Sequence, residues 1–413
     1  MRDQGAEREP GAAPGTRPDA AGGSRTSLAV VYFTVFLDML GFGLVLPVLP
    51  YWARELGASG LALGTVLTSY SLAQLFGSTV FGRLSDRYGR RPLLLASLAG
   101  TTVSMLLSAA APTLGLLAGA RALAGFFGGS IATAQAYIAD RTDLSERPRA
   151  MGLLGAAIGL GFVLGPALGA AVVALGFGFP TAALIAATLA LANLLIAAVR
   201  LEESHVSRAE RPGRLATLRR HWSDGPMRSL LLANFFLTGS FVVLETTFAY
   251  FGAVRFGLGA AGFGLVMFGI GAVMVVVQGS LFGSLSQRFG VAALARSGAA
   301  LCCVALLVLP LFDALPFAVA ALALIAVGRA LAAPSLSTLV SVGAGDEQGA
   351  LMGLLQSLAA ASRASIPVLA GWLYDVEIGL PYLAGSGLAL VGLLLLWGVR
   401  RPHPATEPAR RDL

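Results

Sequence analysis

Two carboxyl side chains lie deep in long apolar stretches of the chain, where charged groups are rare. Asp38 lies eleven residues after Ser27 in the stretch 27–51, and Glu245 lies in the stretch 228–253. Charged residues inside membrane-spanning segments face the protein interior and mark ion or proton paths. Burial in hydrocarbon favours the neutral form of a carboxyl, so such groups can take up and release protons. We therefore expect Asp38 and Glu245 to be proton-coupling residues.

Arginines also lie within the apolar stretches. Arg121, in the stretch 113–139, is the expected counter-charge of Asp38. Glu245 has no basic residue near it in its own stretch, so we rank Glu245 as the proton carrier. Asp38 and Arg121 are then expected to set the substrate's charge preference and the helix position. A static ion pair that only holds helices together is the alternative, and it applies most to Arg329 and Arg363.

The apolar stretches that contain these groups identify a helical membrane protein. Of the 413 residues, 56% are hydrophobic and only 12% are charged, with a mean hydropathy of +0.77. Soluble proteins carry about 25% charged residues, and a helix needs about 20 apolar residues to cross a bilayer. We predict an all-α membrane protein whose twelve transmembrane helices lie at roughly 27–51, 60–81, 92–111, 113–139, 149–174, 178–199, 228–253, 260–282, 291–312, 314–341, 350–374 and 378–399.

Several classes of function have no support in the sequence. The net charge of +7 comes from arginine alone and is explained by loops at a membrane, so no nucleic-acid partner is expected. Cys302 and Cys303 are adjacent and can frame neither a disulfide scaffold nor a zinc site. The three histidines lie in polar segments, so no metal is expected. No phosphate-binding loop is present. We expect neither an enzyme nor a resident cofactor, with the proton gradient as the energy source.

The chain divides into two related halves. The segment 82–89 returns as 283–290, residues 151–154 return as 352–355, and Pro166 returns as Pro367, all at one offset of 201 residues. A parallel repeat of this kind predicts two pseudo-symmetric six-helix bundles with a site between them at mid-depth. The expected units are a disordered tail 1–26, a first bundle 27–199, a linker 200–227, a second bundle 228–399 and a tail 400–413.

The distribution of arginine predicts the orientation. With the amino terminus inside, 24 of the 29 arginines fall in the tails, in the inner loops or near the inner ends of the spans. Cytoplasmic loops carry such an excess of basic residues. We therefore expect a multi-pass protein of the cytoplasmic membrane, with both termini and the linker in the cytoplasm. Its expected partners are a small-molecule substrate, protons and the lipid bilayer, and a monomer is expected.

The loop between the second and third spans carries a specific motif, Gly-Arg-Leu-Ser-Asp-Arg-Tyr-Gly-Arg-Arg-Pro at 82–92. Gly82 and Gly89 allow a tight turn and close helix approach. Asp86 can accept hydrogen bonds from a neighbouring helix amino terminus, while Arg87 and Arg90 can pair with acids. Arginines that only set topology are the alternative. With its spaced glycines around Asp86, the loop resembles the signature loop of the major facilitator superfamily.

A second motif lies in the fifth span, where Gly161, Gly165, Pro166 and Gly169 follow one another at helical spacing. Small residues four apart let helices pack backbone to backbone, and a proline bends the helix. The motif is similar to the one that marks the antiporter branch of that superfamily. Plain helix packing is the alternative reading.

Together with the first and fourth spans, these motifs resemble the drug:proton antiporters, most closely the tetracycline efflux branch. The resemblance implies proton-coupled efflux of small amphipathic compounds by alternating access. It also implies an inner gate in which Arg90 pairs with Asp140 beside Asp86 and stabilises the outward-open state. Transport of a sugar or another metabolite, and a membrane sensor of the same fold, are alternatives. Candidates for the substrate cavity are Gln135, Asn234, Phe241, Gln278, Gln356 and Arg363, although polar residues within spans often serve as interhelical contacts.

Overall fold

The computed structural model describes residues 20–128, 130–143, 146–204, 224–343 and 348–398. Within these ranges the chain is helical, with no strand. Residues 1–19 of the predicted amino-terminal tail, the predicted tail 400–413 and most of the predicted linker, 205–223, lie outside the described residues, whereas residues 20–26, expected to be disordered, begin helix α1. The described part of each of the twelve apolar stretches is mostly helical, which confirms the predicted fold class.

The described residues of the first half form eight helical segments. The first predicted span is divided, because Pro47 and Pro50 cannot donate to the helix ladder where α1 ends and α2 begins. The fourth span is divided at Gly128. The bounds are α1 Ala20–Val45, α2 Leu49–Glu55, α3 Gly60–Tyr88, α4 Arg90–Ala109, α5 Leu114–Phe127, α6 Ser130–Arg141, α7 Arg147–Ala174 and α8 Phe179–Arg200.

The second half follows the same plan. A π-helical turn, Val277–Leu281, joins α11 to α12, and a short 3₁₀ turn, Leu309–Leu311, ends the ninth span. The bounds are α10 Gly225–Phe256, α11 Ala260–Val276, α12 Phe282–Phe289, α13 Val291–Val308, α14 Leu315–Gly343, α15 Gln348–Val376 and α16 Leu380–Trp397. In the described part, nine helices are long and apolar enough to cross a membrane.

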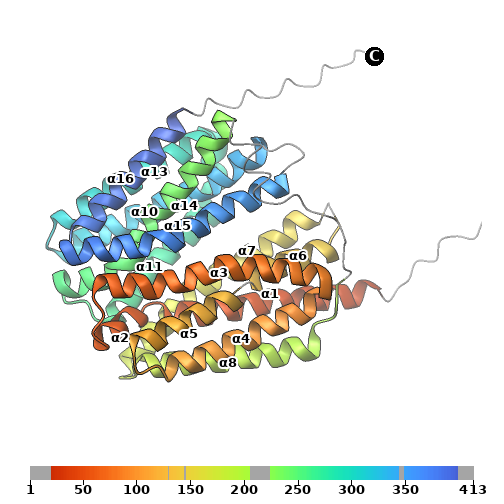
Figure 1. Cartoon of the computed structure of the whole chain (residues 1–413). Helices are drawn as coiled ribbons and strands as arrows, with labels where there is room; N and C mark the ends of the chain where they lie inside the picture. Colours follow the sequence, from red (N-terminus) through yellow and green to blue (C-terminus); the bar gives the residue numbers. More distant parts are fainter. Residues whose placement is uncertain (1–19, 129, 144–145, 205–223, 344–347, 399–413) are drawn as a thin grey trace, which may run out of the picture.

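The longer helices α3 and α15 are not among those nine, because polar side chains interrupt their apolar character. These two helices face each other across the interface between the halves, where α3 and α15 lie side by side in opposite directions (Figure 1). α7 and α11 form the second contact between the halves. The more polar helices are therefore placed at the interface and not on the outer surface.

The repeat is visible in the backbone. Gly89 follows α3 with a φ of 101°, and Gly290 follows α12 with a φ of 81°. Side chains other than glycine rarely adopt a positive φ, so the turn explains why both copies of the repeat place glycine there. The two glycines close corresponding spans of the two halves.

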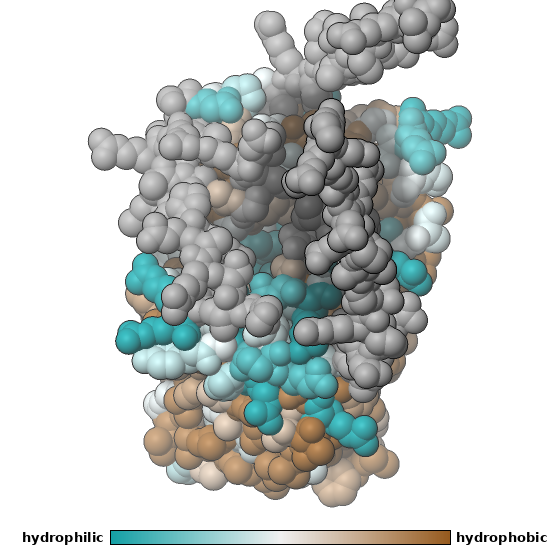
Figure 2. Space-filling model, turned by 90° about the vertical axis from the view of Figure 1, so that its right-hand side faces the viewer, coloured by the Kyte–Doolittle hydropathy of each residue, from teal (hydrophilic) through white to brown (hydrophobic). Residues whose placement is uncertain are grey.

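The two halves touch at one end of the molecule. We call this the Gly60 end, where the chain turns at 56–59, 257–259 and 377–379; the opposite, Arg90 end contains 89–90, 201–204 and 290. All hydrogen bonds between described residues of the two halves lie at the Gly60 end. Towards the Arg90 end, on the right of Figure 1, α3 and α15 diverge. Figure 2 views that end, with hydrophilic residues across its middle and apolar residues below.

Candidate functional site

The Asp38 carboxyl lies beside the division of the fourth span. Its Oδ2 accepts a 2.5 Å hydrogen bond from the hydroxyl of Ser130, the first residue of α6. Asp38 is partly exposed, whereas Leu37 and Met39 on either side of it are buried. The carboxyl therefore reaches accessible space within the bundle, while the flanking side chains fill the core.

The break between α5 and α6 is held by side chains of neighbouring helices. The Ser97 hydroxyl on α4 donates to the carbonyl oxygen of Phe127, and the Gln74 amide on α3 donates to that of Gly128 at 3.4 Å. A broken helix inside a membrane leaves carbonyl groups that need such partners. The break places Ser130 at a helix start, where its hydroxyl can reach Asp38.

Arg121 does not pair with Asp38, and this expectation is wrong. Arg121 is 3% exposed, and its Nη2 donates to the Ser108 hydroxyl at 2.9 Å, with the Met105 sulfur at 3.2 Å. The two partners lie on α4, so the guanidinium is turned towards that helix. The charges of Asp38 and Arg121 both act on the Tyr70 hydroxyl of α3. Tyr70 therefore lies within electrostatic range of both groups.

Glu245 lies on α10, partly exposed, with arginines of two other helices near it. The charges of Arg363 on α15 and Arg329 on α14 both act on its carboxyl. The Arg329 guanidinium lies 5.6 Å from the centre of the Phe241 ring, one turn before Glu245. Glu245 has no basic neighbour on its own helix, as expected, but the inference that its carboxyl has no arginine nearby is wrong. Both arginines come from other helices, so the sequence of α10 alone gives no sign of them.

Arg363 connects the second half to the first. Its charge acts on Glu245 in the second half and on Tyr70 in the first half. Among the described residues it has no hydrogen-bond or ion-pair partner. Asp38, Arg121, Glu245, Arg329 and Arg363 thus form one group of charges at the middle of the bundle, which we call the central charge group. With both acids ionised, its net charge is +1.

The other cavity candidates differ from one another. Asn234 is buried, and its amide donates to the Leu355 carbonyl oxygen at 3.0 Å, so it links α10 to α15. This is the interhelical role that we weighed as the alternative. Gln135, Gln278 and Gln356 are exposed. Phe241 is partly exposed, and its ring faces the guanidinium of Arg329, so it lies next to the central charge group.

The predicted pair at the Arg90 end forms. Arg90 Nε donates to Asp140 Oδ2 at 3.0 Å, and the side chains are 3% and 9% exposed. The two residues belong to the same half, and they are paired here while α3 and α15 diverge at this end (Figure 1). Their pairing therefore does not require closure of the Arg90 end, contrary to its expected link with the outward-open state. The Asp86 side chain lies outside what the structure describes.

The glycines and arginines of the same loop behave differently from one another. A Cβ on Gly89 would lie 2.6 Å from a Glu203 carboxylate oxygen, whereas one on Gly82 would meet nothing within 4 Å. The close approach expected at Gly82 is therefore wrong in this conformation. Arg87 is exposed and stacks on the neighbouring Tyr88 ring at 5.3 Å.

The glycine motif of α7 packs against α1. A Cβ on Gly161 would lie 2.5 Å from the Met39 Cβ, one on Gly165 would lie 2.7 Å from the Gly43 Cα, and one on Gly169 would lie 2.4 Å from the Leu44 oxygen. Real Cβ atoms do not come so close. The opposite side of α7 contacts the second half, because a Cβ on Gly264 of α11 would lie 3.1 Å from the Pro166 oxygen. The motif therefore joins α1, α7 and α11.

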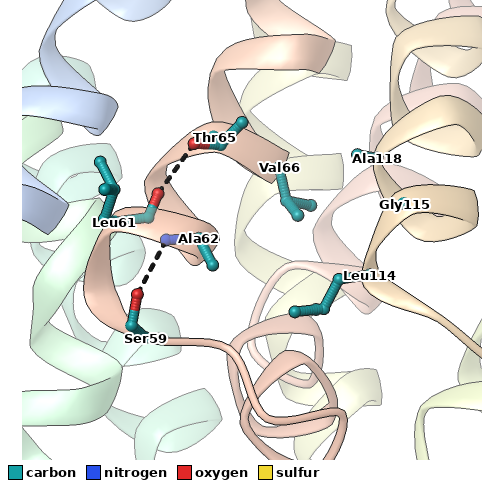
Figure 3. Close-up of a pocket in the computed structure, with 8 residues that line it drawn as sticks. All are labelled: Ser59, Leu61, Ala62, Thr65, Val66, Leu114, Gly115 and Ala118. Carbon is teal, nitrogen blue, oxygen red and sulfur yellow. Dashed lines mark hydrogen bonds between the residues drawn. The ribbon is translucent and has the colours of Figure 1, made fainter.

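A surface pocket of about 370 Å³ lies elsewhere, between α3 and α5 at the Gly60 end (Figure 3). Its lining carries no charged side chain and is mostly apolar. It contains none of the central charge group, so we do not regard it as the transport site.

Sequence reasoning missed several polar groups. Ser130 donates to Asp38 from another helix, the Asp38 charge acts on the Tyr70 hydroxyl, and Glu203 accepts hydrogen bonds from the backbone N–H groups of Arg90 and Arg91 at 2.7 and 3.2 Å. The glycine pair before Ser130 was a usable signal for a broken helix. Glu203 gave no signal, because its partner lies 113 residues away along the chain.

Two bundles of apolar helices, with charged side chains from both bundles at the middle, are typical of a membrane transport protein. The family model of the Major Facilitator Superfamily matches residues 31–365. The chain therefore belongs to the major facilitator superfamily, whose members are transporters and not enzymes.

Relatives with known names extend over most of the chain. The tetracycline resistance protein of class C from Escherichia coli is 33% identical over 384 residues, which is 90% of this chain and 96% of that protein. Multidrug resistance protein 1 of Bacillus subtilis (strain 168) is 28% identical over 381 residues, with 91% and 97% covered. The crystal structure of the human organic anion transporter MFSD10 has a TM-score of 0.65 at 26% identity, with 90% and 99% covered.

Proposed function

We propose that this transporter exports small amphipathic compounds, including drugs, in exchange for protons. The observation that carries the proposal is the position of two partly exposed carboxyls, one in each half, near the three arginines of the central charge group. Asp38 has a hydroxyl partner and Glu245 has two arginines nearby. Carboxyls placed in this way can exchange a proton for a substrate, since both bind best to the ionised form.

We derive the proposed transport cycle from the closure of the two halves at the Gly60 end. In the orientation predicted from arginine, the Gly60 end is outside and the Arg90 end faces the cytoplasm. The conformation is then inward-facing, with Asp38 and Glu245 ionised to receive substrate. Rocking of the halves opens the Gly60 end. Protons from outside then neutralise the carboxyls and favour release of the substrate, and deprotonation on the cytoplasmic side restores affinity.

The relatives support export of drugs. They are named for tetracycline resistance and multidrug resistance, and they match more than 88% of this chain at identities of 27–33%. A glycine motif of the antiporter type lies on α7, where it touches both halves. We place the protein in the cytoplasmic membrane with both termini inside.

A second candidate is the export of organic anions. The central charge group carries three arginines against two acids, and Arg363 has no partner among the described side chains. A carboxylate or sulfonate on the substrate would supply the missing partner. The similarity to MFSD10, a human organic anion transporter, favours the same class.

The experiment is transport by the purified protein in lipid vesicles, with and without a proton gradient. The panel contains tetracycline, a lipophilic cation, a hydrophobic sulfonate and a sugar. We expect gradient-dependent accumulation of tetracycline or the cation, and none of the sugar. Accumulation of the sulfonate alone would favour the second candidate. Equal accumulation without a gradient would contradict proton coupling. Vesicles that contain the Asp38→Asn and Glu245→Gln double variant serve as the control for passive leak of the compounds across the membrane.

A further inference from the structure

The amino terminus of α3 obtains its hydrogen bonds from both halves of the molecule. The first backbone N–H groups of a helix have no partner within the helix. At α3, the Ser59 hydroxyl accepts from Ala62 at 3.2 Å (Figure 3), and the Ser59 carbonyl accepts from Leu63 at 3.0 Å. The N–H groups of Gly60 and Leu61 remain, and among the described residues their hydrogen-bond acceptor belongs to the second half.

Asp375, the second-to-last residue of α15, accepts both. Its Oδ1 receives the Gly60 N–H at 2.6 Å and its Oδ2 receives the Leu61 N–H at 2.8 Å. Both carboxylate oxygens are thus used, and the charge lies at the positive end of the α3 dipole. Charge-assisted hydrogen bonds at a helix amino terminus are stronger than neutral ones. Asp375 is an acid of the second half that caps a helix of the first.

The surrounding packing makes this contact depend on closure. A Cβ on Gly371 would lie 2.0 Å from the Gly60 oxygen, and one on Gly64 would lie 2.2 Å from the Pro367 oxygen. The backbones of α3 and α15 therefore touch directly next to the cap. The Tyr51 hydroxyl donates to the Leu258 oxygen at 2.9 Å and closes the same end from α2. Separation of the halves would break all of these contacts together.

We propose that Asp375 is a gating residue that holds the Gly60 end closed by capping α3 across the two halves. When this end opens, the N–H groups of Gly60 and Leu61 and the Asp375 carboxylate must find water instead. The cap therefore stabilises the closed end. The stabilisation equals the difference in free energy between the two hydrogen bonds to Asp375 and the hydrogen bonds to water that replace them. Asp375 lies away from the central charge group, so its role concerns the equilibrium between conformations and not the binding of substrate or proton.

Cysteine labelling tests the proposal without any substrate, so its result is independent of the proposed efflux function. Cys302 and Cys303 are replaced by alanine, and Leu67→Cys, two turns from Gly60 on α3, is the reporter. Leu67 is half-buried against the cores of both halves at the closed end. A membrane-impermeant maleimide is applied from each side. A second protein with Glu377→Cys, exposed in the turn before α16, identifies the side on which the Gly60 end lies.

We expect Asp375→Asn to raise the labelling rate of the reporter about tenfold from the side where Glu377→Cys reacts. An amide has one acceptor oxygen and no charge, so it cannot cap both N–H groups. The matched control is Glu377→Gln, which removes the same charge two residues further on and should change the rate by less than about twofold. Asp375→Glu, which keeps the carboxylate, should restore part of the protection.

Equal labelling of the parent and Asp375→Asn would overturn the proposal, as would an equal rise in Glu377→Gln. If Asp375→Asn fails to fold, Tyr51→Phe provides the second measurement. It removes a 2.9 Å hydrogen bond between the halves at the same end, and combined with Asp375→Glu it should label faster than either single variant. If the combined Tyr51→Phe and Asp375→Glu variant is labelled at the same rate as the parent protein, polar contacts do not hold this end closed.

Discussion

The Ser130 hydroxyl donates a 2.5 Å hydrogen bond to the Asp38 carboxyl, across the boundary between α6 and α1. The bond exists because the fourth span breaks after Gly128, so that Ser130 begins a new helix. The break in the fourth span therefore places the hydrogen-bond donor of a carboxyl that we propose to bind protons.

Loss of this hydrogen bond should weaken proton coupling. Ser130→Ala leaves Asp38 without its donor, and a hydrogen bond to a charged group contributes about 1.5–3 kcal/mol. We expect gradient-driven transport to fall roughly tenfold in vesicles. Ser78→Ala is the control, because the Ser78 hydroxyl donates only to Leu75 of its own helix. Equal transport by the two variants would show that Ser130 does not act through Asp38.

We rank Glu245 above Asp38 as the proton carrier because no basic residue lies near it in its own helix; since Arg329 and Arg363 approach it from other helices, this ranking needs a direct test. Glu245→Gln removes the titrating group but keeps its shape, so proton-driven accumulation should stop while downhill exchange of substrate continues. Both are measured in the same vesicles with and without a gradient. If Glu245→Gln still concentrates substrate and Asp38→Asn does not, the assignment of the two acids is reversed.

The buried ion pair at the Arg90 end should matter for stability. Removal of one partner from a buried pair costs about 3 kcal/mol, so Arg90→Ala should lower the thermal unfolding midpoint in detergent by several degrees. Arg141→Ala is the comparison, since its 3.4 Å pair with Glu202 is 20% and 58% exposed and contributes at most about 1 kcal/mol. Similar thermal midpoints for the two variants would show that the buried ion pair stabilises the protein no more than the exposed one does.

Two acids on α3 and α15 should bias the conformation in opposite directions. We expect Asp86→Asn to favour opening of the Arg90 end and to slow transport while the protein remains folded and inserted. Asp375→Asn should favour opening of the Gly60 end. Labelling of a single cysteine from each side distinguishes these outcomes. Normal transport by the Asp86→Asn variant would contradict a role for Asp86 in an inner gate.

The glycine motif of α7 offers a test within one helix. A Cβ on Gly165 would lie 2.7 Å from the Gly43 Cα, whereas Gly159 has open space around it. Gly165→Ala should destabilise the protein by about 3 kcal/mol through overpacking. Gly159→Ala should stabilise α7 by up to about 1 kcal/mol, because alanine favours helix. The thermal midpoints of both variants, in the same detergent, measure the difference.

The helices could be predicted from the sequence because their signal is local. Each span needs only its own apolar length, and the repeat at 201 residues fixed the division into halves. The ion pair of Arg90 with Asp140 was also predicted, through resemblance to a family motif. The breaks after Val45 and Gly128 were not, although Pro47 and the glycines at 128–129 mark them in the sequence.

The contacts of the site could not be predicted in the same way, because they depend on how the helices rotate and pack. Arg121 turns towards Ser108 on α4, and Arg363 approaches Glu245 from α15. Neither follows from spacing along one helix. Asp375 and Gly60 lie 315 residues apart, and their contact exists only when the halves close at that end.

Proton release on substrate binding tests the central claim most directly. The purified protein in weakly buffered detergent solution is mixed with tetracycline, or with the panel compound that it transports, and the pH change is recorded. Exchange of proton for substrate on the same carboxyls predicts that binding releases protons and that affinity falls as the pH is lowered. Glu245→Gln should release fewer protons than the parent protein. Binding that takes up protons, or leaves the pH unchanged at every starting pH, would contradict proton antiport.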